Sequence, residues 1–450
     1  MSDLVLLMEL SVMSRRSEAL LTLAAITIGV LAFFIARVNT DVNDTGSVVL
    51  FAVVCAVALL THAGIRRFAP AADELILPTA TLLNLLGLTM IHRLDIADVQ
   101  RAARQGVAPP ESTFSTQSAW TLLGLSLLLL ILLAVRDHRQ LQRYTYTSML
   151  AGVVLLLMPL LPIVGASING ARLWVRVGVL SFQPGEFAKL LLAVFFAGFL
   201  VLKRDSLALI RIRTFGIGFP RPRDLGPILV CWLISVAILV FQRDLGTSLL
   251  FFGLFVSVLY FATGQRTWLA LGAALFLFGA TVAYFLFGHV RVRVQVWLDP
   301  FAYADGQGYQ VVQSLYGLAS GGMFGTGLGD GFPYLVPFAK SDFILSALGE
   351  ELGLIGLAAI LMLYAVLVQR GLRIAGSVRD GFGQLLAAGL AVVLGLQTFI
   401  VAGGVTRLIP LTGLTTPFLT AGGSSLVANW VALGLLLRIS DTAARMREAA

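Results

Sequence analysis

Long apolar runs, separated by short polar breaks, dominate this chain. A helix that crosses a membrane needs about 20 mostly apolar residues, and the pattern predicts twelve such helices. Their expected ranges are 18–38, 45–65, 73–93, 118–136, 147–165, 183–202, 226–241, 245–263, 268–288, 342–369, 382–404 and 417–438. The pattern therefore predicts an all-α polytopic membrane protein, in which lipid is the solvent for most of the chain.

Composition supports this interpretation and excludes a soluble multidomain protein. Of 450 residues, 58% are hydrophobic and 12% are charged, with a mean hydropathy of +0.90, whereas soluble domains carry about 25% charged residues. The first apolar run lacks a cleavage site with small residues, so it is interpreted as a retained span and not as a signal peptide. Two cysteines in apolar runs and four unclustered histidines predict neither a disulfide framework nor a metal site.

The distribution of positive charge predicts the orientation. Lysine and arginine accumulate in cytoplasmic loops of membrane proteins, and placing both termini in the cytoplasm puts most of them on that side. The net charge of +8 is then explained by topology and attraction to anionic lipids, so no nucleic-acid binding is expected. The strongest cytoplasmic marker is a cluster of six residues, Lys203, Arg204, Arg211, Arg213, Arg221 and Arg223.

The longest stretch without a spanning helix is 289–341, which this orientation places outside the cell. Its residues 308–319 have the spacing of an amphipathic surface helix, and the glycines that follow favour tight turns. The ending of a phosphate-binding loop is missing there. Since long loops rich in aromatic residues are usually functional, this stretch is predicted to cover a site. The polar segment 95–117 is expected to be an ordinary exposed connection.

Charged residues at membrane depth are the next candidates, because an unpaired one costs at least about 2.5–3.5 kcal/mol. Glu186 and Lys189 lie three residues apart after Pro184, a good helix start, so they share a helix face. They either neutralise each other or position a substrate phosphate or a third charged group. Arg243 and Asp244 separate two short apolar runs, where they form either a structural ion pair or part of a site.

Three further groups are open to two interpretations each. Arg172, next to the interfacial Trp174, either binds a substrate phosphate or contacts a lipid headgroup. The small residues at 422–425 either pack helices or face a headgroup. Glu350 and Glu351 project about 100° apart on one helix, so both cannot face lipid cheaply.

Together these segments resemble the SEDS family of FtsW, RodA and SpoVE, over roughly residues 70–440 and in the same order. The matching motifs are SFQPGEFAK (181–189), QRDLGTS (242–248), GYQVVQSL (308–315), SGGMFGTGLG (320–329), KSDFILSALGEE (340–351) and IPLTGLTTPFLTAGGSSL (409–426). The resemblance implies a ten-span core in residues 71–440, after a 1–70 extension with two further spans and before a short cytoplasmic tail, 441–450. The added spans favour a RodA-like over an FtsW-like member.

The resemblance also implies an activity. It implies a peptidoglycan glycosyltransferase that polymerises lipid II at the outer face of the bacterial cytoplasmic membrane, together with a class B penicillin-binding protein. A role in elongation and a role in division both stay open. The sequence requires no cofactor, although a divalent cation is compatible with a diphosphate substrate. Two alternatives remain, a lipid II flippase and a non-catalytic scaffold for the penicillin-binding protein.

Residue roles follow from the same resemblance. Glu186 and Lys189 match the family's charged helix motif, and an essential carboxylate is expected in the 289–341 loop. Tyr303 occupies the position where many relatives have that aspartate, so Asp305 is the first candidate and Asp299 the second. No metal ligand is predicted. The residues expected to bind substrate are Arg172, Arg243, Asp244, Gln310, Gln313, Ser341, Asp342, Glu350, Ser424 and Ser425.

Overall fold

The computed structural model describes residues 2–448, apart from 41–43, 163, 169–170, 178–179, 209–211, 215–216, 220–229, 231–232, 235 and 238–239. Within the described residues the fold is almost entirely helical, as predicted. The helices are α1 (Ser2–Val38), α2 (Thr45–Phe68), α3 (Ile76–Gln105), α4 (Thr113–Ala134), α5 (Thr145–Leu157), α6 (Pro184–Ala208), α8 (Leu245–Thr263), α9 (Thr267–Leu286), α10 (Gly288–Leu298), α11 (Tyr309–Gly321), α12 (Ile344–Ser377), α13 (Gly381–Val405) and α14 (Gly423–Glu448).

The remaining regular elements are short. Strands β1 (Gly165–Ile168), β2 (Ala171–Val177) and β3 (Leu180–Phe182) form an antiparallel sheet, and β4 (Ile212–Thr214) pairs with β5 (Ile217–Phe219). The 3-10 turns are η1 (His138–Tyr144), η2 (Met158–Leu160), η3 (Phe301–Tyr303) and η4 (Pro333–Leu335).

Ten helical segments of the described chain are long and apolar enough to cross a membrane. They are 16–38, 45–68, 113–134, 138–160, 184–204, 245–263, 267–286, 344–377, 381–405 and 423–447. The predicted span at 73–93 is present as the largely buried helix α3, which is not among these ten segments. The predicted span at 226–241 lies mostly outside the described residues.

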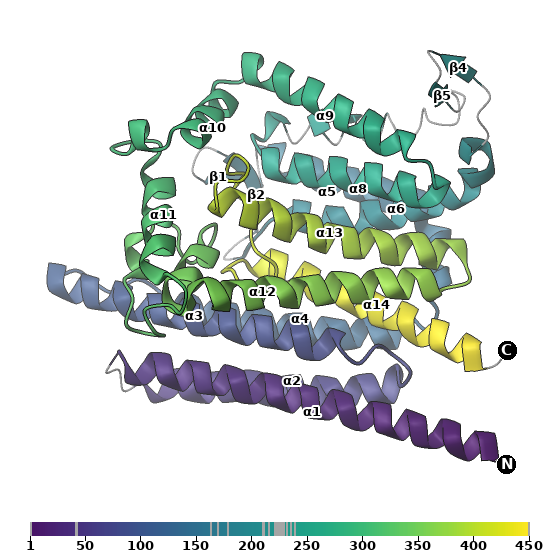
Figure 1. Ribbon diagram of the computed structural model, residues 1–450, viewed down its shortest axis with the longest axis horizontal. Coiled ribbons are helices and arrows are strands. Elements are labelled where there is room, and N and C mark those ends of the chain that lie inside the picture. The colour runs from purple at the N-terminus through teal and green to yellow at the C-terminus, as the bar shows by residue number, and fades with distance from the viewer. Residues whose placement is uncertain are drawn as a thin grey trace.

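The long helices run side by side, with the hairpin of β4 and β5 at one end of the bundle and several other short elements at the other (Figure 1). Helices α10 and α11 and strands β1 and β2 lie at this end, which is called the loop end below. Both chain termini lie at the opposite end. Helices α1 and α2 cover one face of the bundle, and α9 lies along the other side.

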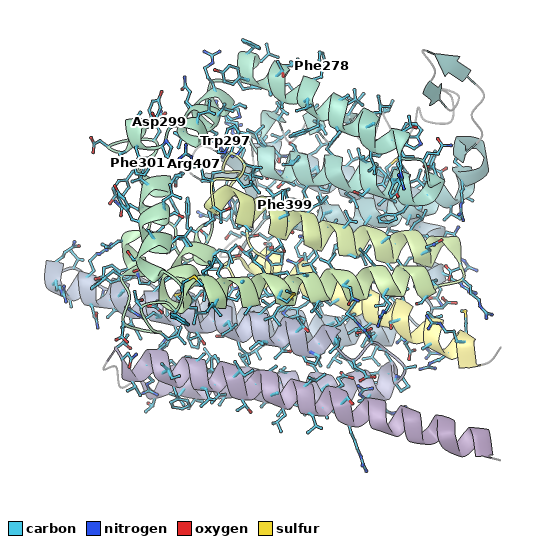
Figure 2. The ribbon with its side chains drawn as sticks, viewed as in Figure 1. Phe278, Trp297, Asp299, Phe301, Phe399 and Arg407 are labelled. Carbon is cyan, nitrogen blue, oxygen red and sulfur yellow. The ribbon has the colours of Figure 1, made fainter. Side chains whose placement is uncertain are left out.

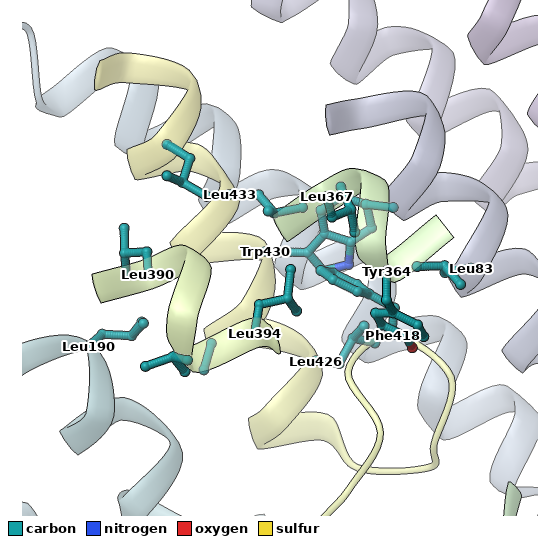
Figure 3. Close-up of a cluster of buried hydrophobic side chains, with 14 of the residues drawn as sticks. Leu83, Leu190, Tyr364, Leu367, Leu390, Leu394, Phe418, Leu426, Trp430 and Leu433 are labelled. Atoms are coloured by element: carbon teal, nitrogen blue, oxygen red, sulfur yellow. The ribbon is translucent and has the colours of Figure 1, made fainter. Parts of the chain in front are cut away.

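Apolar side chains from several helices pack together in the core of the bundle (Figure 3). Leu83 of α3, Leu190 of α6, Leu390 of α13 and Trp430 of α14 belong to this core. Buried Tyr364 of α12 donates its hydroxyl hydrogen bond to the carbonyl of Pro417, which satisfies the polar end of an otherwise apolar ring. The core thereby also fixes the irregular segment that leads into α14.

Only part of the polar segment 95–117 is the exposed connection that its composition predicts, since residues 99–112 are exposed apart from Ala102. Helix α3 continues through it to Gln105, and Asp95 is buried. The Asp95 carboxylate accepts hydrogen bonds from the Phe114 amide at 2.8 Å and the Lys340 ammonium at 2.6 Å. The prediction failed at Asp95 because the lysine that neutralises it comes from a segment 245 residues away.

A break in α12 receives the glycine-rich segment 321–331, called the glycine loop below. Gly353 adopts φ 71° and ψ −175° inside the helix, which is the left-handed half of the backbone map that favours glycine. The amides of Leu354 and Ile355 donate to carbonyls of the loop at 2.9 and 3.2 Å, and the loop amides of Thr326 and Gly327 donate back to α12. The predicted turns are confirmed, since Gly322, Gly325, Gly327 and Gly329 all have positive φ.

The N-terminal hairpin of α1 and α2 packs onto the helices that follow it. Phe33 of α1 stacks on Phe51 of α2 at 4.2 Å and on His92 of α3 at 5.0 Å between ring centroids. Near the loop end, the Asn39 amide donates to the Leu328 carbonyl at 2.7 Å and to the Asp330 carboxylate at 3.0 Å. The hairpin therefore contacts both the bundle and the glycine loop.

Candidate functional site

A cavity of about 440 Å³ opens at the loop end. Helices α10 and α11 form one wall, and the segment that follows α13 forms the other. Its lining mixes apolar and aromatic groups with a few charged ones, as in small-molecule sites generally. The lining residues are His289, Val292, Arg293, Val296, Trp297, Gln307, Gln310, Val311, Asp342, Gly404, Arg407, Ile409, Leu411 and Gly413.

Arg293 of α10 is the central cation of this cavity. Its Nη1 donates to the carbonyls of Leu411 at 3.2 Å and Thr412 at 2.8 Å. Gly413 follows with φ 80°, and a Cβ there would lie 3.5 Å from Asp342 Oδ2 and 3.9 Å from Arg293 Nη2. A glycine at this position therefore leaves the charged pair accessible to the cavity.

Two carboxylates flank Arg293. Burial raises the pKa of the Asp342 carboxyl to about 6, against the lowering effect of the Arg293 charge. Asp244 caps the start of α8, accepting from the Thr247 amide at 2.9 Å and the Thr247 hydroxyl at 2.5 Å. Arg293 attracts both carboxylates. Asp244 therefore caps α8 and attracts Arg293. It is not simply the ion-pair partner of its neighbour Arg243, whose side chain is exposed.

The predicted pair of Glu186 and Lys189 is confirmed at the start of α6. Lys189 donates to Glu186 Oε2 at 2.5 Å and to Gln397 Oε1 of α13 at 2.9 Å, and both charged side chains are buried. Gln397 in turn donates to the Thr415 carbonyl at 2.9 Å. Glu186 also repels Asp244, so this pair adjoins the charges around Arg293.

The two candidate bases both lie on exposed surface at the loop end. Asp299 is the C-cap residue of α10, and its Oδ1 accepts from the Ala302 amide at 3.2 Å. Asp305 lies in the turn between η3 and α11. The cavity lining includes neither aspartate, but Trp297, two residues before Asp299, is part of it (Figure 2).

The predicted substrate-binding residues separate into distinct groups. Gln310 and Asp342 line the cavity. Ser341 donates to the Phe338 carbonyl at 3.3 Å, Gln313 is half-buried on α11, and Arg172 is exposed on β2. Arg243 lines a second cavity of about 460 Å³, with Phe241, Leu286, Phe287 and His289 among its neighbours.

The other three contact protein backbone or neighbouring hydroxyls. Glu350 accepts from the Phe332 amide at 2.7 Å. Ser424 accepts from the Gln183 amide at 2.9 Å, and Ser425 accepts from the Thr415 hydroxyl at 2.9 Å. These contacts hold the glycine loop and the entry to α14. They give no direct indication of a ligand.

Three residues of the site were missed in the sequence, namely Arg293, Gln397 and Arg407. A glutamine inside the apolar run 382–404 was a usable signal, because an amide at membrane depth needs a partner. Arg293 was hidden in the alternating HVRVRVQVW segment, where Arg291 gives the same local signal. Among the described residues no group of three or more histidine, cysteine, aspartate or glutamate side chains is arranged to hold a metal ion.

Known proteins match this chain along most of its length. The FtsW/RodA/SpoVE family model, described as cell cycle protein, matches residues 73–445. A protein of Mycobacterium tuberculosis named peptidoglycan glycosyltransferase RodA is 49% identical over 437 residues, covering 96% of this chain and 91% of that protein. The protein of the same name from Mycobacterium leprae is 49% identical over 431 residues, covering 95% and 91%.

Solved structures of similar proteins also superpose on this chain. A chain from a structure described as "Structural coordination of polymerization and crosslinking by a peptidoglycan synthase complex" superposes with a TM-score of 0.65 at 27% identity, covering 83% of this chain and 98% of that chain. The crystal structure of the rod shape determining protein RodA of Thermus thermophilus gives a TM-score of 0.56 at 26% identity, covering 82% and 96%.

Proposed function

The chain belongs to the FtsW/RodA/SpoVE family, and we propose that it is a peptidoglycan glycosyltransferase, RodA-like, which polymerises lipid II at the outer face of the bacterial cytoplasmic membrane. The names of its relatives, and the length over which they match this chain, support the activity. The observation in this chain that carries the proposal is the cavity at the loop end, whose lining includes Arg293 and the carboxylate of Asp342. The buried carboxylate of Asp244 acts on the same arginine from outside the lining. With the loop end at the outer face, both chain termini are proposed to lie in the cytoplasm.

The reaction requires a general base for the attacking hydroxyl and a cation for the leaving diphosphate. The 4-hydroxyl oxygen of one sugar forms a bond to C1 of another, while the bond from C1 to the lipid diphosphate breaks. A carboxylate that accepts the hydroxyl proton contributes about 10²–10⁴-fold. We assign this role to Asp299 ahead of Asp305, because Asp299 ends an ordered helix and its side chain is held by the Ala302 amide.

The leaving diphosphate needs positive charge where its negative charge develops. Arg293 is better suited than Lys189, because the Lys189 ammonium is already bound by Glu186 and Gln397. Arg293 binds two carbonyls through Nη1 and has Nη2 near Gly413 at the cavity. Arg243, at the second cavity, and Arg172 stay candidates for contacts with the lipid headgroup.

The partner is proposed to be a class B penicillin-binding protein. One solved relative comes from a complex that couples polymerization to crosslinking, and a polymerase at the outer face needs a crosslinking enzyme to incorporate its product. We propose a role in cell elongation, because one relative named RodA is described as a rod shape determining protein. Depletion that rounds the cells supports this role, whereas filamentation would assign the protein to division.

The decisive experiment uses purified protein in liposomes with lipid II. We expect glycan polymer from the wild type and a loss of polymer in Asp299→Ala and Arg293→Gln at equal amounts of folded protein. Translocation of lipid II without any polymer would identify a flippase. Normal cell shape with Asp299, Asp305 and Arg293 all replaced would identify a scaffold.

A further inference from the structure

The end of α10 is joined to the segment after α13 by a reciprocal set of hydrogen bonds. Figure 2 shows Trp297 and Arg407, the residues that form them, near each other at the loop end. Arg407 donates from Nε to the Trp297 carbonyl at 2.8 Å and from Nη2 to the Leu298 carbonyl at 2.5 Å. In return, the Trp297 indole donates from Nε1 to the Arg407 carbonyl at 3.1 Å. The two residues are 110 positions apart, so the contact is purely tertiary.

These hydrogen bonds pair backbone carbonyls at the C-terminal end of α10. The last carbonyls of a helix have no partner within it, and arginine is suited to them because its charge complements the helix dipole. The planar guanidinium can bind two acceptors at once with little loss of side-chain freedom. Arg407 thus fixes the final turn of α10, and the next residue in the chain is Asp299.

The contact holds the backbone of Arg407 in an energetically unfavourable conformation. Arg407 has φ 61°, a left-handed conformation that is uncommon for residues other than glycine and asparagine. Such conformations persist where surrounding contacts hold them, and they concentrate at functional sites. The Trp297 bond to the Arg407 carbonyl is one of these contacts. Both side chains also line the cavity.

We propose that Arg407 and Trp297 form a latch that positions Asp299 beside the cavity, and that Arg407 is therefore a positioning residue for glycosyl transfer. This inference rests on the proposed function and on Asp299 as the base. The latch joins the α10 wall of the cavity to the opposite wall formed by 404–413. It therefore sets the separation between the carboxylate and the cavity that holds the reacting sugars.

The test compares Arg407→Lys and Trp297→Phe with Arg291→Gln in full-length protein reconstituted with lipid II. Lysine keeps the charge but cannot bind two carbonyls in a plane, and phenylalanine removes only the indole donor. Arg291, on the same helix, donates to the Phe285 carbonyl at 3.2 Å and lies over Tyr284 away from the cavity. It is the matched control for a helix α10 arginine.

We expect Arg407→Lys to lower kcat about 10- to 100-fold, because a displacement of about 1 Å can cost that much. Trp297→Phe should lower kcat by a smaller factor, and Arg291→Gln should leave it unchanged. KM and the melting temperature should stay close to wild type in all three. An Arg407→Lys protein with wild-type kcat, or with lost activity explained wholly by a lower melting temperature, would overturn the latch.

A double substitution separates positioning from a merely structural role. If Arg407 acts through Asp299, adding Arg407→Lys to Asp299→Ala should cost nothing further in single-turnover assays with excess enzyme, since groups acting as a unit are not additive. An additional loss equal to that of the single variant would refute the inference. Absence of polymer from the wild type would instead refute the proposed function, so the two failures are distinguishable.

Discussion

The glycine loop and the loop-end cavity are built from the same kinds of charged residue but use them differently. At the glycine loop, Arg93 donates to the carbonyls of Gly329 and Gly331 at 3.0 and 2.9 Å and lies 3.3 Å from the Glu351 carboxylate. Glu351 accepts from the Gly329 amide at 3.1 Å. The hydrogen bonds join α3 or α12 to loop backbone, the ion pair joins α3 to α12, and both charged side chains are buried.

At the cavity, Arg293 also binds two carbonyls, but open space remains beside its guanidinium and beside Asp342. The comparison shows that a charge at membrane depth does not by itself identify a binding site. A site needs a charge whose partners leave part of it accessible. Substitutions at the cavity should therefore change activity, whereas substitutions at the glycine loop should change stability.

The largest effect is expected from the loop carboxylates. Asp299→Ala should lower kcat by about 10²–10⁴-fold, the usual contribution of a general base, while Asp305→Ala should retain most of the activity. Polymer yield per folded protein measures both. Because both aspartates are exposed, neither change should alter the melting temperature. A severe loss in Asp305→Ala with an active Asp299→Ala would reverse the assignment.

The two arginines provide the direct contrast. Arg293→Gln should lower kcat/KM by about 10²–10³-fold, as for other groups that stabilise developing negative charge, with a smaller loss of stability than Arg93→Gln because Arg293 and Asp342 border the open cavity. Arg93→Gln should leave buried Glu351 without its cation and destabilise the fold by about 3–5 kcal/mol, with normal activity in the protein that stays folded. Melting in detergent and polymerisation rates on the same samples decide between these outcomes. Equal behaviour of the two variants would contradict the comparison.

Gly353 tests the glycine loop without touching a charge. A Cβ at this position would lie 2.3 Å from the Gly325 amide nitrogen and 2.6 Å from the Met323 carbonyl oxygen, and alanine disfavours φ 71°. Gly353→Ala should therefore lower the melting temperature by several degrees, as expected for a loss of a few kcal/mol. Gly376→Ala on the same helix is the control, because a Cβ there meets open space.

The smallest effect concerns pH at the cavity. Burial raises the pKa of Asp342 to about 6, so its carboxyl is neutral below that pH and charged above it. The charged form offsets Arg293 and repels a diphosphate, so KM for lipid II should rise several-fold as pH increases through about 6. Asp342→Asn should remove this pH dependence and leave the rest of the profile unchanged. A pH-dependent KM that persists in Asp342→Asn would assign the titration to another group.

The titration of Asp342 should also change the stability of the fold, which is expected to fall as the carboxyl becomes charged. A carboxyl whose pKa is raised on folding contributes stability that is present below its ordinary pKa of 3.8 and is lost as pH rises through about 6. Asp342→Asn should therefore be relatively more stable than the wild type above pH 6, which melting at several pH values would detect.

Sequence alone determined the features that depend on near neighbours and on the solvent. Apolar runs of membrane-spanning length locate the helices because lipid cannot satisfy backbone polar groups. The spacing of Glu186 and Lys189 places them on one helix face, and the glycines of 321–331 indicate turns whatever they contact. Family resemblance then gave the activity, which the relatives support.

Tertiary structure alone decided which charges are used and which remain accessible. Arg291 and Arg293 look alike in the sequence, yet only Arg293 meets the carbonyls of Leu411 and Thr412, 118 and 119 residues away. Glu350 was predicted from the sequence as a substrate ligand, and only the structure shows that its carboxylate accepts a hydrogen bond from the Phe332 amide. The physical reason is that a buried charge is stabilised by whichever polar groups packing brings within about 3 Å, and that choice depends on how distant helices meet.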